Sequence, residues 1–156
     1  MKTSDVHELV SKDFCDFGQL LSTTEASAAA DNTEYTYWGK IGGMVFGEKA
    51  SSGILLCHKR SFVVESFERH ERTPEVLVAL DGDSVICLAK PLTQPTDVKW
   101  FKVHQGDAFA LHAGTWHWIP FPTNSNESRF LVIFAWGTEE SDLHYFDLQN
   151  PIRSVP

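Results

Sequence analysis

The predicted fold starts from residues 68–82, which read Glu68-Arg69-His70-Glu71-Arg72-Thr73-Pro74-Glu75-Val76-Leu77-Val78-Ala79-Leu80-Asp81-Gly82. Glu68 and His70 are two residues apart on a predicted strand, so their side chains point to the same face. The proline turn before Glu75 can bring the Glu75 carboxylate back beside His70. Asp81-Gly82 separates two β-rich runs and predicts a two-residue hairpin, because both turn positions need a positive φ.

A second polar stretch begins at Gly106 and ends at His117. His112 ends one predicted strand and His117 begins the next, with a turn at Ala113-Gly114 between them. The chain has seven histidines, and histidine is both the commonest metal ligand and the acid or base of neutral pH. These two stretches therefore hold the candidate site.

The rest of the chain reads mostly as short strands separated by Gly, Pro and polar turns. The predicted strands cover residues 35–38, 44–46, 53–58, 62–70, 75–80, 84–89, 100–104, 108–112, 116–119, 129–136 and 143–147. One short helix is expected within residues 8–21, capped by Ser11 and interrupted by Gly18. Many short strands with few helices predict an all-β sandwich or barrel.

Length and composition favour a single domain over residues 1–156. Within it we expect the helix and first strands in residues 1–60, the barrel motifs in 61–136, and a C-terminal strand and tail in 137–156. Residues 26–33 and the acidic run 139–142 read as loops, and residues 150–156 as a loose or edge-lying end. Cys57 and Cys87 fall inside strand patterns and are expected to be buried.

The charge balance excludes some classes of partner. The chain has 13 Lys and Arg against 21 Asp and Glu, a net charge of -8. Nucleic acids and anionic membranes are bound mainly by clustered basic residues, so neither is expected as a partner. No apolar run approaches the roughly 20 residues of a membrane span, and the N-terminus lacks a secretory pattern, so a cytoplasmic protein is expected. The three widely spaced cysteines read as reduced thiols.

The two polar stretches resemble the paired motifs of the cupin superfamily. The first motif, G-x5-H-x-H-x3,4-E-x6-G, is matched by His70, Glu75 and Gly82, with Glu68 where its first histidine is expected. The second, G-x5-P-x-G-x2-H, is matched by Gly106, Gly114 and His117, with His112 in place of the proline. The resemblance implies a cupin-type double-stranded β-helix, a jelly-roll barrel, with a metal held by His70, Glu75 and His117.

Glu68 is either a further metal ligand or a general base. Imidazoles and carboxylates inside an apolar barrel suit a divalent transition metal such as Ni, Zn, Mn or Fe, and are costly to bury without one.

A narrower resemblance, to the ureidoglycolate lyase family, covers nearly the whole chain. It is carried by residues 12–18, by Phe67-Glu68-Arg69-His70 and by His112-Ala113-Gly114-Thr115-Trp116-His117. The chain departs from the family in having Glu75 where Gln is usual, Cys57-His58-Lys59-Arg60 where an F-R-x strand is usual, and Ala135-Trp136 where an Asp-Arg pair is usual.

This resemblance implies a metal-dependent lyase that splits ureidoglycolate into glyoxylate and urea. Glu68 or His112 would be the catalytic base. Arg60, through its bidentate fork, and Trp116, on the rim, are the candidate substrate contacts, with a solvated strand end and core packing as the alternatives.

Two further functions are consistent with the same residues: another metal-dependent cupin enzyme, a dioxygenase or an isomerase, or a small-molecule-binding cupin without catalysis. The expected partners are a small-molecule substrate and a second copy of the chain in a homodimer.

Overall fold

The computed structural model describes residues 3–154 and consists mostly of strands, which confirms the predicted all-β fold. The two helices are α1 (Ser11–Phe14) and α2 (Thr138–Ser141). The strands are β1 (Thr3–Ser4), β2 (Val6–His7), β3 (Gly18–Leu20), β4 (Ala30–Asp31), β5 (Thr36–Tyr37), β6 (Ala50–His58), β7 (Val63–Arg69), β8 (Glu75–Asp81), β9 (Ser84–Ala89), β10 (Lys99–Val103), β11 (Ala108–Leu111), β12 (Trp116–His117), β13 (Phe121–Pro122), β14 (Glu127–Ala135) and β15 (His144–Ser154).

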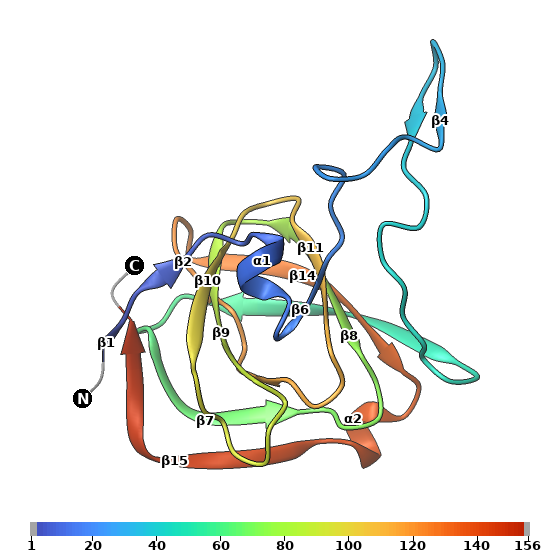
Figure 1. Ribbon diagram of the computed structural model, residues 1–156. Helices are drawn as coiled ribbons and strands as arrows, with labels where there is room; N and C mark the ends of the chain where they lie inside the picture. Colours follow the sequence, from blue (N-terminus) through green and yellow to red (C-terminus); the bar gives the residue numbers. More distant parts are fainter. Residues whose placement is uncertain (1–2, 155–156) are drawn as a thin grey trace.

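Two curved sheets face each other and enclose the core (Figure 1). One is 8-stranded, with the order β1-β15-β7-β12-β9-β10-β2 and β13 paired to β9. The other is 5-stranded, with the order β3-β11-β8-β14-β6. This arrangement is the jelly-roll barrel expected from the two motifs.

The predicted hairpin at Asp81-Gly82 is wrong, because β8 and β9 lie in different sheets. Of the two turn residues only Gly82 has a positive φ, 69°. Asp81 ends β8 instead, and its carboxylate accepts bonds from the backbone N–H and the Nε of Arg129, at 3.0 and 2.6 Å. The chain therefore crosses here from one sheet to the other, and no hairpin forms.

The core follows from strand alternation, in which successive side chains point to opposite faces. Ile86 and Leu88 of β9 point inward to a cluster that includes Leu77 and Phe109 of the facing sheet. The intervening β9 residues point the other way, into a second cluster around Trp100, Trp116 and Phe121. β9 is consequently buried on both faces, and Cys57 and Cys87 are buried as predicted.

The predicted helix is much shorter than the pattern suggested. α1 has four residues, its N-cap is Val10 rather than Ser11, and no side chain caps it. Gly18 begins β3, which pairs with β11. A Cβ at Gly18 would overlap the carbonyl oxygen of Ala110, so close strand pairing rather than helix interruption explains this glycine.

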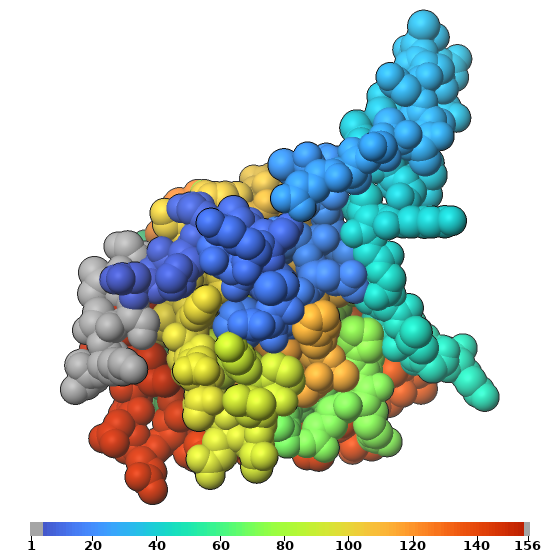
Figure 2. Space-filling view, viewed as in Figure 1, coloured from blue at the N-terminus to red at the C-terminus, as the bar shows by residue number. Residues whose placement is uncertain are grey.

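Residues 22–49 form an arm that extends away from the barrel (Figures 1 and 2). Its only strands within residues 3–154 are β4 and β5, which pair with each other, so the loop predicted over 26–33 is partly strand and no strand forms at 44–46. Tyr35, Tyr37 and Val45 are exposed along it. The arm adds nothing to either core cluster.

The C-terminal segment is better ordered than a loose end. β15 runs to Ser154 and pairs with β7 on one side and with β1 on the other. The last two residues of the predicted tail lie outside the described residues. Within residues 3–154, no helix is long and apolar enough to cross a membrane.

Candidate metal centre

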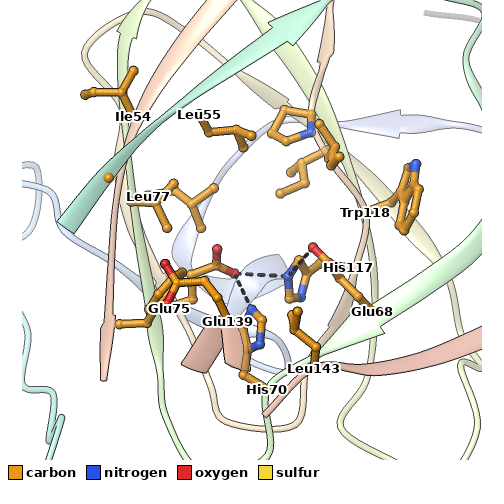
Figure 3. A pocket seen from close by; sticks show the side chains of 16 residues that line it. Ile54, Leu55, Glu68, His70, Glu75, Leu77, His117, Trp118, Glu139 and Leu143 are labelled. Atoms are coloured by element: carbon orange, nitrogen blue, oxygen red, sulfur yellow. Dashed lines mark ion pairs between the residues drawn. The ribbon is translucent and has the colours of Figure 1, made fainter. Parts of the chain in front are cut away.

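Three buried polar side chains meet inside one end of the barrel (Figure 3). His70 directly follows β7, His117 ends β12, and Glu75 begins β8 of the opposite sheet. Their exposed fractions are 5% for each histidine and 8% for Glu75. We call these three residues the ligand cluster. It combines residues of both predicted motifs.

The strand pairing explains how distant residues come together. The turn before β12 is tied to the first motif by a 2.6 Å bond from the N–H of Gly114 to the carbonyl oxygen of His70. Gly114 has a φ of 85°, which suits glycine at this turn. In the same pair of strands, His117 lies directly opposite Glu68. The two motifs therefore meet through β7 and β12.

The distances within the ligand cluster are compatible with one metal ion. Oε2 of Glu75 is 3.0 Å from Nε2 of His117 and 3.8 Å from Nε2 of His70. Ligand atoms bound tetrahedrally to one zinc, at about 2.1 Å each, lie about 3.4 Å from one another. A ligand atom from each of the three residues falls within 4.8 Å of the others. These residues could hold a divalent metal.

Two atoms of the cluster lack a hydrogen-bond partner in the described part of the chain: Oε2 of Glu75 and Nε2 of His117. Their 3.0 Å contact is at ion-pair distance but is not aligned as a hydrogen bond. Leaving a buried polar atom unsatisfied costs about 1–3 kcal/mol. A metal ion bound between them would satisfy both atoms, which makes their orphaned state evidence for a ligand.

Both imidazoles are oriented by backbone carbonyl oxygens. Nδ1 of His70 is 3.0 Å from the carbonyl oxygen of Asp142, and Nδ1 of His117 is 3.0 Å from that of Thr115. A carbonyl oxygen only accepts, so each Nδ1 carries the proton and donates it. In the neutral imidazole this leaves the Nε2 lone pair free, and both Nε2 atoms face Glu75.

Asp142 belongs to a second polar cluster, which we call the anchor cluster: Glu71, Arg72, Asp142 and His144. The Asp142 carboxylate accepts the backbone N–H groups of Glu71 and Arg72, at 3.1 and 2.9 Å. Burial raises its pKa, but these two N–H bonds, His144 and the Arg72 charge outweigh that effect, so the pKa is lowered. The solvated loop predicted for 139–142 is therefore only partly right: residues 139–141 are exposed, but they lie in α2, and Asp142 is buried.

Without a metal, the ligand cluster holds a proton. Burial alone would raise the pKa of Glu75, but His117 and His70 lower it overall. Burial lowers the pKa of His117, but the charge of Glu75, and to a lesser extent that of Glu68, raises it to about 9. The pair is thus an imidazolium beside a carboxylate, and a metal must displace that proton.

Glu68 lies at the side of the ligand cluster. Its Oε1 is 3.6 Å from Nε2 of His117, and its side chain is 20% exposed. The cross-strand pairing with His117 holds it there. From this position Glu68 could contact either a metal or a bound molecule, so both predicted roles are compatible with its place.

The other predicted site residues do not line the cavity. His112 is exposed, and its Nε2 lies 3.3 Å from the carbonyl oxygen of Cys15. Trp116 is buried in the second core cluster, where its indole N–H donates to the carbonyl oxygen of Leu92. These two residues connect elements of the barrel.

Arg60 also makes structural contacts rather than lining the cavity. Its guanidinium donates to the carbonyl oxygens of His58, Ile119 and Pro120 and stacks over the ring of Phe121 at 3.9 Å. Burial lowers its pKa. Since Ile119 and Pro120 line the cavity, Arg60 supports the cavity wall from behind.

The ligand cluster opens into a cavity of about 270 Å³. Most of the wall is apolar, and its lining residues are Gly53, Ile54, Leu55, Glu68, His70, Glu75, Leu77, Ile86, His117, Trp118, Ile119, Pro120, Val132, Phe134, Glu139 and Leu143. No local pattern indicates that Glu139 and Leu143 line the cavity, because α2 reads only as part of an acidic run. No Lys or Arg is among these lining residues.

The fold resembles those of several solved structures. The capsular polysaccharide assembling protein CapF from Staphylococcus aureus matches with a TM-score of 0.52 and 7% identity, over 76% of this chain and 34% of that chain. Vicilin from hazelnut, Corylus avellana, matches with a TM-score of 0.47 and 14% identity, over 64% of this chain and 27% of that chain. Oxalate decarboxylase from Bacillus subtilis matches with a TM-score of 0.44 and 15% identity, over 64% and 24%.

The chain thus spans about a quarter to a third of these proteins, and at such low identity the likeness concerns the fold alone. None of the curated proteins compared with the chain matches it. The model of the ureidoglycolate lyase family, in contrast, matches residues 1–154, nearly the whole chain. On that match, the chain belongs to the ureidoglycolate lyase family, the family of enzymes that residues 12–18, 67–70 and 112–117 resemble.

Proposed function

We propose that this protein is a metal-dependent lyase that converts ureidoglycolate into glyoxylate and urea. Family membership supports the reaction. The observation that carries the metal dependence is a pair of buried atoms without a hydrogen bond, Oε2 of Glu75 and Nε2 of His117, which face each other with Nε2 of His70 nearby.

His70, Glu75 and His117 would hold the metal. Two imidazole nitrogens and one carboxylate oxygen suit Zn, Ni, Fe or Mn, and leave coordination positions open. When bound, a divalent ion supplies a Lewis acid that polarises the carboxylate and hydroxyl oxygens of a substrate.

Glu68 is the catalytic base in this proposal. Its carboxylate takes the proton of the substrate hydroxyl, the oxygen forms the carbonyl of glyoxylate, and the electron pair of the breaking C–N bond goes to nitrogen. The same proton then reaches that nitrogen, which leaves as urea. The apolar residues Leu77, Val132 and Phe134 keep bulk water from the reacting atoms.

The test is release of glyoxylate and urea by metal-loaded protein, compared with chelator-treated protein. We expect product formation that falls to background after metal removal and returns when metal is added. Absence of product at high enzyme concentration, with the metal site filled, would contradict the proposal. Elemental analysis of a His70→Ala, His117→Ala double variant tests the site itself, and an unchanged metal content would exclude these ligands.

A second candidate rests on the composition of the ligand cluster. Two histidines and one carboxylate with open positions also form the ligand set of non-haem Fe(II) oxygenases. Fe(II) bound on purification, with oxygen uptake in the presence of a substrate, would favour a dioxygenase over the lyase.

We also propose that the chain forms a homodimer. β6 is an edge strand of the 5-stranded sheet, and Ile54 and Leu56 are exposed on it. The arm projects from the same molecule with Tyr35 and Tyr37 exposed. A second copy supplies apolar surface to both. Sedimentation should give twice the mass of 17.6 kDa, and a single monomeric species would refute this proposal.

A further inference from the structure

The cavity has an unbalanced charge beyond the ligand cluster. Glu68 and Glu139 both line it, and no Lys or Arg does among the residues that the structure describes. In Figure 3 Glu68 lies on the His117 side of the ligand cluster and Glu139 on the Glu75 side. A molecule bound at the cluster therefore meets negative charge on both flanks.

The backbone of Glu139 belongs to α2, which is anchored at both of its ends. The Thr138 hydroxyl donates to the carbonyl oxygen of Ala135 at 2.7 Å, and the N–H of Asp142 closes α2 onto Thr138. Within residues 3–154, the carboxylate of Glu139 has no ion pair and no hydrogen bond. Its neighbour Glu140 does not line the cavity. Glu139 is thus an exposed carboxylate with a free acceptor capacity at the cavity.

Such a carboxylate selects for N–H donors, and most strongly for donors that carry positive charge. The ureido group of ureidoglycolate offers N–H donors without charge. A guanidinium offers the same planar arrangement of donors with a full positive charge and matches a carboxylate in a bidentate geometry. No Lys or Arg among the described lining residues competes for Glu139.

We propose that this site also cleaves the guanidino analogue, 2-guanidino-2-hydroxyacetate, more efficiently than ureidoglycolate, with Glu139 binding the guanidinium. This rests on the proposed lyase function and on the same ligand cluster. The substrate carboxylate and hydroxyl would face the cluster, while the guanidinium would lie against Glu139.

The reaction balances without a further reagent. Glu68 takes the hydroxyl proton, the oxygen forms the carbonyl of glyoxylate, and the C–N electron pair passes to the guanidinium, which leaves as neutral guanidine. The proton on Glu68 then passes to guanidine. Urea, in contrast, leaves as an anion unless it is protonated in the same step, so the positively charged substrate has the better leaving group.

The test compares the two substrates on metal-loaded protein by glyoxylate release. For the unmodified protein we expect kcat/KM to be about tenfold or more higher for the guanidino substrate. Glu139→Gln should lower that value about tenfold and the ureidoglycolate value less than about threefold. Glu140→Gln, on the same helix but outside the cavity, should change neither. A ratio of the two values that Glu139→Gln leaves unchanged would overturn the proposal.

A binding experiment separates this inference from the lyase proposal. Guanidinoacetate and ureidoacetate lack the hydroxyl group and cannot react, so their affinities for the metal-loaded protein can be measured by calorimetry. Tighter binding of guanidinoacetate that is lost in Glu139→Gln supports the selectivity even if neither hydroxy acid is cleaved, in which case only the lyase proposal fails. Equal binding of the two, or cleavage of ureidoglycolate alone, refutes the selectivity.

Discussion

The ligand cluster and the anchor cluster lie side by side at one end of the barrel, yet their buried polar atoms are treated differently. Both carboxylate oxygens of Asp142 accept a backbone N–H. Oε2 of Glu75 and Nε2 of His117 accept or donate nothing within the described chain. The hydrogen bonds of the anchor cluster are made within the fold, whereas two atoms of the ligand cluster make none. This difference distinguishes a structural role for the anchor cluster from a ligand-binding role for the ligand cluster.

The largest expected effect comes from removing one residue of the ligand cluster. His117→Ala should abolish both metal binding and lyase activity, because one of the three ligands is lost and the buried Glu75 charge keeps one fewer partner. Metal content by elemental analysis and glyoxylate release are the measurements. His104→Ala, at an exposed histidine that does not line the cavity, is the control. Full metal content in His117→Ala would show that the cluster is not the metal site.

Changing the base without the ligands should have a smaller effect. Glu68→Gln keeps the shape of the side chain but cannot take a proton, so kcat should fall about 10²- to 10⁴-fold. The metal content should stay near that of the unmodified protein. Glu65→Gln, at an exposed position of the same strand, should retain activity. If Glu68→Gln loses the metal instead, Glu68 is a ligand rather than a base.

Disturbing the anchor cluster tests whether the two clusters are coupled. Asp142→Asn replaces a carboxylate that accepts two N–H bonds, so we expect a loss of about 1–3 kcal/mol in the free energy of unfolding. Because the backbone of Asp142 orients His70, metal affinity should fall about 10- to 100-fold. Chemical denaturation and metal titration measure the two effects, with Asp147→Asn as the exposed control. Lower stability with unchanged metal affinity would show that the clusters are independent.

The protonation of His117 in the ligand cluster predicts that stability and metal affinity depend on pH. The pKa of His117 is raised to about 9 in the metal-free protein, so its proton stabilises that form below the unfolded pKa and the contribution is lost as pH rises through about 9. A metal must displace the same proton, so its affinity should rise about tenfold per pH unit from pH 7 toward 9. Titrations at several pH values measure this, and a flat profile would contradict a protonated His117.

Local pattern was enough to predict much of the fold and the residues of the ligand cluster. The strand at 84–89 was located correctly because a short apolar run with β-branched residues is bounded there by turn residues. His70, Glu75 and His117 were found because they match the two cupin motifs, and the structure brings them together. The positions of these three residues depend on a strand end and two turns, which are short-range features that a sequence motif captures.

Long-range contacts account for the predictions that differed. Asp81-Gly82 looks like a hairpin, but β8 finds its partners in β11 and β14. Arg60 looks like a substrate contact, yet its guanidinium donates to carbonyl oxygens about sixty residues away in the sequence. Glu139 and Asp142 sit in one acidic run, and only tertiary packing sends one to the cavity and the other into the anchor cluster.

The ligand cluster draws its members from both sheets, His70 and His117 from one side and Glu75 from the other. A bound ion would therefore cross-link the two sheets of the barrel. An ion that binds only the folded protein adds about 2.7 kcal/mol of stability at a hundredfold excess over its Kd. Without the metal, the end of the barrel that holds the ligand cluster would unfold locally more often and become accessible to proteases. The lifetime of this enzyme in the cell would then follow the metal supply.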